Sequence, residues 1–150
     1  MEHVKTEEYL NEILEKNYDA ARGYLDAATN VKNVHLKRWL TERGAMRSRY
    51  CARLGQEMKG MNMEPVNDGT VLGDIHRGWM NIKTALSFNK DEAVFEECMR
   101  GEKNLLDEYT EALEHRRELP PTIHAVLKEE ADEVAATVAK LNRLEDIADD

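Results

Sequence analysis

Polar side chains occupy the middle of four apolar helical stripes, where groups that carry chemistry would meet. The residues are Asn17, Arg43, Arg47, Glu102 and Glu130. Positions three and four apart share one face of a helix, so each side chain is expected to point toward neighbouring helices. Carboxylates at such a level either pair with arginine, whose fork donates two hydrogen bonds, or bind a metal ion.

Three interpretations of this polar level remain open from the residues alone. In the first, Arg47, with or without Arg43, is buried and neutralises Glu102 and Glu130 where a metal ion would otherwise sit. Such a layer would fix helix pairing and register more than it adds net stability. In the second, the same charges lie at a solvated rim, with their stems packed on the core and their heads in water.

In the third interpretation, the carboxylates form a metal site without imidazole. Its ligands would be Glu102, Glu130 and Glu133, with Glu15 as a further candidate. Oxygen donors suit Mn²⁺, Mg²⁺ or Ca²⁺ at least as well as iron. For this alternative we predict Fe or Mn as the cofactor, whereas the arginine layer needs no cofactor. No residue is predicted to be catalytic in either case.

The composition excludes several classes of protein. The chain has 150 residues and a formal net charge of -9, so a basic face for nucleic acid or for an anionic membrane is not expected. No apolar run approaches the roughly 20 residues of a membrane span, and the first residues are too polar for a secretory signal. Two cysteines, Cys51 and Cys98, do not make a disulfide scaffold and are expected to be small buried apolar residues. We expect an acidic cytoplasmic protein.

Apolar residues recur at three- and four-residue intervals, which predicts helices rather than strands. Pro65 and Gly69 interrupt the pattern, as do Pro120 and Pro121. The predicted helices cover 6–29, 34–59, 70–86, 91–116 and 121–147.

The lengths and spacing of these helices predict an all-α fold. Four segments are each near 25 residues long, and the turns that join the first two and the last two are short, so each pair is expected to form an antiparallel hairpin. The segment 70–86 would then be a crossover helix that returns the chain to the starting end of one domain spanning 1–150. An array in which 70–86 is a full fifth member is the alternative.

Two runs of sequence carry a family resemblance. LNEILEKNYDAARGYLDAA and LGDIHRGWMNIKTALSFNKDEAVFEECMRGEKNLLDEYTEAL resemble a bacterial family of uncharacterised, ferritin-like four-helix-bundle proteins. The resemblance implies a ferritin-like bundle and carries no activity. Di-iron members of the wider group place one Glu on the first and third helices and Glu-x-x-His on the second and fourth.

This chain departs from that di-iron pattern. Asn17 stands in the stripe of the first helix, where the pattern needs Glu. The histidine position of Glu-x-x-His is Ala45 after Glu42 on the second helix and Glu133 after Glu130 on the last helix. We therefore expect no histidine-containing di-iron site, and this favours a non-enzymatic protein over an enzyme. It would act through self-association or an unidentified protein partner, with Trp39 extending an apolar face that favours a dimer. The alternative is a carboxylate-only metal-binding protein or a metal-dependent oxidoreductase of the ferritin-like group.

Overall fold

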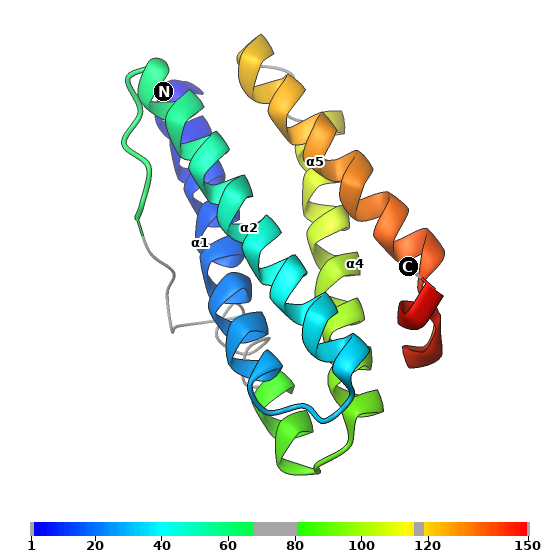
Figure 1. The fold of residues 1–150 in the computed structure, drawn as a ribbon. Coiled ribbons are helices and arrows are strands. Elements are labelled where there is room, and N and C mark those ends of the chain that lie inside the picture. The colour runs from blue at the N-terminus through cyan, green and yellow to red at the C-terminus, as the bar shows by residue number, and fades with distance from the viewer. Residues whose placement is uncertain (1, 68–80, 116–118, 150) are drawn as a thin grey trace.

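The computed structural model describes residues 2–67, 81–115 and 119–149 (Figure 1). These residues contain helices and no strand, which confirms the predicted all-helical class. The elements are α1 (Glu2–Ala28), α2 (Val34–Gly60), α4 (Asp91–His115), α5 (Pro121–Lys140) and the 3-10 helix η1 (Leu144–Asp149). Within the described residues, no helix is long and apolar enough to cross a membrane.

The predicted crossover helix 70–86 falls largely outside the described residues. Of that segment only 81–86 is described, within a helical stretch that covers 81–87. The turn after it reverses at Asn89, whose φ of 57° lies in the left-handed region that asparagine tolerates.

The α1–α2 hairpin is held by a defined cap. The Asn33 side chain accepts hydrogen bonds from the backbone N–H groups of His35 and Leu36, at 2.9 and 3.0 Å. Because these N–H groups have no partner within the helix, the cap fixes where α2 begins. Proline at the first position of α5 has the same effect there, because its missing N–H is not needed.

Contacts between helices establish their directions. Tyr9 of α1 donates to the Glu108 carbonyl, whereas Tyr24, further along α1, donates to the earlier Cys98 carbonyl, so α1 and α4 are antiparallel. The Asp91 side chain accepts from the backbone of Lys32, which places the start of α4 beside the start of α2.

Helices α2 and α4 therefore run in the same direction (Figure 1). The α2–α5 contacts also run antiparallel, because Tyr50 reaches Glu133 whereas the later Arg53 reaches the earlier Glu129. The chain between α2 and α4 must consequently return from one end of the helices to the other.

The prediction of one helix over 121–147 is wrong at its C-terminal end. Helix α5 stops at Lys140, and Leu141 has extended backbone angles, φ -112° and ψ 112°. The Asp146 carboxylate accepts hydrogen bonds from the backbone N–H groups of Asn142 and Arg143, at 2.8 and 3.0 Å. A side chain that satisfies these donors competes with the helix ladder. The turn brings Leu141 and Ile147 into the core, where they are 3% and 1% exposed.

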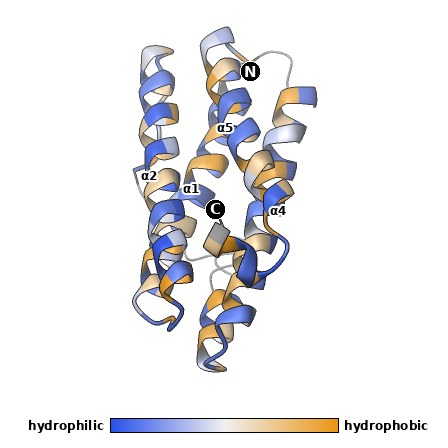
Figure 2. Ribbon diagram, turned by 45° about the vertical axis from the view of Figure 1, so that its right-hand side comes forward, coloured by the Kyte–Doolittle hydropathy of each residue, from blue (hydrophilic) through white to orange (hydrophobic). Residues whose placement is uncertain are grey.

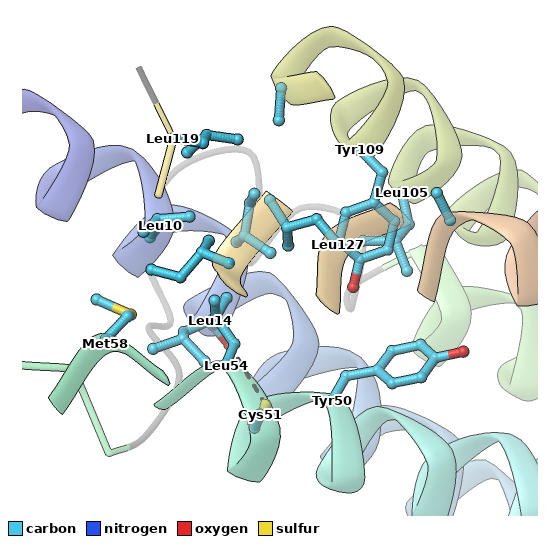
Figure 3. Packing of buried hydrophobic residues seen from close by; sticks show 14 of the residues in the cluster. Leu10, Leu14, Tyr50, Cys51, Leu54, Met58, Leu105, Tyr109, Leu119 and Leu127 are labelled. Atoms are coloured by element: carbon cyan, nitrogen blue, oxygen red, sulfur yellow. Dashed lines mark hydrogen bonds between the residues drawn. The ribbon is translucent and has the colours of Figure 1, made fainter. Parts of the chain in front are cut away.

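The apolar core consists of two clusters, one toward each end of the helices. The first includes Leu10, Leu14, Leu54 and Leu127 (Figure 3). Hydrophobic and hydrophilic residues succeed each other along every helix in Figure 2, as expected for helices with one buried side.

The second cluster contains Trp39, which corrects one expectation. Its ring is 2% exposed and lies between Tyr24 and Phe95, with ring centroids 6.4 and 5.8 Å away. The argument that Trp39 provides a surface for a dimer is therefore wrong. The stripe pattern was ambiguous because a residue at the edge of a stripe can face either a third helix or water.

Two helical glycines are expected to respond oppositely to substitution by alanine. A Cβ atom at Gly44 would lie 3.1 Å from Leu25 Cγ and 3.3 Å from the Ala21 carbonyl oxygen, whereas one at Gly101 would meet only the Tyr24 hydroxyl, at 3.6 Å. Gly101→Ala should raise the free energy of unfolding by about 0.5–1 kcal/mol through helix propensity. Gly44→Ala should lower it by about 1 kcal/mol, because forcing α1 and α2 apart outweighs that gain. Urea unfolding of both variants measures the two signs, and equal shifts would contradict the close α1–α2 approach.

Candidate functional site: a buried arginine–carboxylate layer

The predicted polar level is buried inside the helices. Asn17, Arg43, Arg47, Glu102 and Glu130 are 1%, 7%, 2%, 0% and 0% exposed. The solvated-rim interpretation is therefore wrong. On α1 the layer separates Leu14 of the first cluster from Tyr24 of the second.

Both oxygens of Glu102 accept hydrogen bonds from arginine. Arg43 Nε donates to Oε1 at 3.0 Å, and Arg47 Nη2 donates to Oε2. Burial alone would raise the pKa of Glu102, but the two guanidinium groups outweigh burial and hold that pKa below its usual value. Burial would likewise lower the pKa of Arg47, and the charge of Glu102 overcomes it, so the pKa of Arg47 is raised.

A chain of hydrogen bonds continues from Arg47 across the layer. Arg47 Nη1 donates to Asn17 Oδ1 at 3.1 Å, and Asn17 Nδ2 donates to the Tyr109 hydroxyl at 3.4 Å. The Tyr109 hydroxyl donates to Glu130 Oε1 at 2.8 Å. The layer thereby connects all four long helices, because its members come from α1, α2, α4 and α5.

Tyr109 was not predicted as a member of the layer. From the sequence it belonged to the apolar stripe of its helix, seven residues after Glu102. A tyrosine has a polar tip that needs a partner when buried, and this was the one available signal.

Glu130 differs from Glu102 in having no arginine partner. Its Oε2 atom is buried without a hydrogen-bond partner among the described residues. Burial is the main reason that the pKa of Glu130 is raised to about 8, with Glu133 and Glu129 adding to it and Tyr109 and Arg53 opposing it. The expectation that arginine neutralises both carboxylates is therefore correct for Glu102 and wrong for Glu130, whose raised pKa favours the protonated form near neutral pH.

The predicted metal ligands do not form one cluster. Glu133 is exposed and accepts a hydrogen bond from Tyr50 at 2.6 Å, Glu15 is half-buried, and Glu102 is bound by both arginines. Among the described residues there is no group of three or more histidine, cysteine, aspartate or glutamate side chains that could hold a metal ion.

The di-iron donor pattern does not fit the described residues. Glu42 and Ala45, which align with the Glu-x-x-His positions of the second helix, are both exposed. Guanidinium groups occupy the space beside Glu102 where that pattern would need a metal.

A pocket of about 420 Å³ lies beside the layer, between α1 and α4. Its inner wall includes Arg47 and Tyr24, whose ring centroid lies 5.4 Å from the Arg47 guanidinium carbon. Ile82 and Leu105 are apolar neighbours, and the α4 side contributes Asp107 and Glu111 among its acidic residues. Sequence reasoning missed this pocket because it depends on the separation of two helices.

Comparison with known proteins identifies the family. A family model described as a domain of unknown function, DUF2383, matches residues 5–115. This chain belongs to the DUF2383 family. No curated protein and no solved structure matches the chain. The predicted membership of an uncharacterised family is thus confirmed, and the function of that family is unknown.

Proposed function

We propose that this DUF2383 protein is a non-enzymatic helical bundle of ferritin-like connectivity. It acts in the cytoplasm of a bacterium through self-association or a protein partner. The observation that carries the proposal is the double arginine contact to a fully buried Glu102. Arginine supplies the positive charge that a metal would supply in a di-iron relative.

The chemistry of guanidinium supports a structural role for the layer. Arginine stays protonated at any pH at which the protein folds, and its donors point in fixed directions. A buried pair of this kind adds little net stability but penalises every packing in which a charge loses its partner. The layer therefore specifies which helix faces lie together, and it leaves Glu102 no free oxygen for catalysis.

Exposed apolar side chains support a role in association. Val34 and Phe88 are 70% and 65% exposed, and both lie at the end of the molecule where Asp91 joins the α1–α2 turn to the start of α4. Two exposed apolar side chains at one end of the molecule are available for a contact with another molecule.

One observation favours the alternative of a carboxylate metal protein. Glu130 Oε2 is buried and unpartnered among the described residues, and Glu133 lies one helical turn further along α5. A metal at this pair would be Fe or Mn bound through oxygen. The two glutamates would provide anchors, and the remaining ligands would be water.

Metal analysis of tag-free protein separates the two candidates. We expect less than one metal ion per chain, and a melting temperature that neither chelator nor added Fe or Mn changes, because specific binding must stabilise the folded state. The matched variant Glu130→Gln/Glu133→Gln should behave like wild type in this test. One or two ions per chain, lost in that variant, would overturn the proposal in favour of the metal protein.

A further inference from the structure

Phe88 is an exposed aromatic residue on an ordered turn. Its backbone N–H donates to the Ala85 carbonyl at 3.2 Å, and the Ser87 hydroxyl donates to the Thr84 carbonyl at 2.6 Å. The exposure of its side chain, 65%, therefore belongs to a fixed conformation. Aromatic residues are enriched at protein interfaces, so a ring held in water on an ordered turn can serve as an anchor there.

Two lysines lie near this anchor in the chain. Lys83 and Lys90 flank Phe88 in the chain, both are exposed, and neither forms an ion pair among the described residues. The chain carries a net charge of -9, and the acidic residues Asp91 and Glu92 follow Lys90, so the basic part of this patch is the pair of lysines. Its natural complement is an acidic surface with an apolar floor.

The pocket between α1 and α4 combines acidic residues with apolar ones. Its basic residues are already paired, because Lys16 contacts Glu108, Arg100 contacts Glu97 and Arg47 contacts Glu102. Asp107 and Glu111 remain without an ion pair among the described residues, one helical turn apart on α4. A cavity of roughly 150 Å³ holds benzene, so a pocket of about 420 Å³ has room for an aromatic ring.

We propose that two copies of this chain form a two-fold dimer in which Phe88 of each copy enters the α1–α4 pocket of the other. Lys83 and Lys90 then lie against Asp107 and Glu111 of the partner copy. Two-fold symmetry makes the contact twice, since each copy carries both the anchor and the pocket. The inference rests on the self-association in the proposed function and names its surface.

Reciprocal charge reversal tests this pairing by sedimentation velocity. Lys83→Glu/Lys90→Glu and Asp107→Lys/Glu111→Lys should each weaken dimerisation by about tenfold or more, because like charges then meet in both contacts. An equimolar mixture of the two variants should dimerise like wild type, because both contacts in the mixed dimer are complementary again. Homodimers of either variant that persist unchanged, or a mixture that stays monomeric, would overturn the inference.

Phe88→Ser tests whether the aromatic side chain contributes to the dimer. It should weaken the dimer by about tenfold or more, whereas the control Met61→Ser, which removes a 39% exposed apolar residue after α2, should not. Thermal melts of all variants establish that each one folds. A wild-type chain that dimerises while Phe88→Ser has no effect overturns this contact alone. A wild-type chain that stays monomeric at all concentrations also removes self-association from the proposed function.

Discussion

Arg47→Met should lower the free energy of unfolding by roughly 3–5 kcal/mol, the largest loss expected from one substitution in this protein. Methionine fills a similar volume, so the loss reflects charge rather than a cavity. Glu102 is 0% exposed and would keep Arg43 as its remaining partner, while Asn17 Oδ1 would lose its donor. Equilibrium urea unfolding at neutral pH measures the change.

Arg53→Met is the matched control for that substitution. Arg53 also lies on α2 and pairs with a glutamate of α5, with a distance of 2.8 Å to Glu129. Its side chain is 39% exposed, and that of Glu129 is 62% exposed, so the pair is largely solvated. The expected loss is about 0–1 kcal/mol. Similar losses in the two variants would show that the Arg47–Glu102 layer is as hydrated as the surface pair.

Glu130→Gln should remove a pH dependence of stability that the wild-type protein shows between about pH 5 and pH 8. The folded-state pKa of Glu130 is raised to about 8 from an ordinary value of 4.5, chiefly by burial. In that window the folded protein keeps the proton and the unfolded chain releases it. Wild-type stability therefore falls as the pH rises, by about 1.4 kcal/mol per pH unit at most.

Glutamine mimics the protonated acid and still accepts the hydrogen bond from Tyr109, so the variant should match wild type near pH 5 and become progressively more stable than wild type toward pH 8. Urea unfolding at several pH values gives the difference curve. Glu129→Gln is the control, since it changes an exposed carboxylate one residue away. Parallel wild-type and Glu130→Gln profiles would contradict a buried, proton-bearing Glu130.

Both predictions depend on partners that could not be read from the sequence. The spacing of three and four residues placed Asn17, Arg47 and Glu102 on inward faces, because that periodicity is a property of a single helix. Which atoms meet depends on the height and rotation of one helix against another. Glu102 accepts hydrogen bonds from both arginines, whereas Glu130, within the described part of the chain, accepts one only from the hydroxyl of Tyr109.

Local sequence by itself determined the helical class, the starts of α2, α4 and α5, and the presence of polar residues on the apolar stripes, because caps, prolines and apolar periodicity act within a few residues along the chain. Tertiary structure decided the features that depend on residues far apart in the chain. It buried Leu141 and Ile147 beyond the end of α5 at Lys140, and it enclosed Trp39 between two aromatic rings. It also opened the α1–α4 pocket and left Phe88 exposed, since only the packing of whole helices determines which apolar residues find a neighbour.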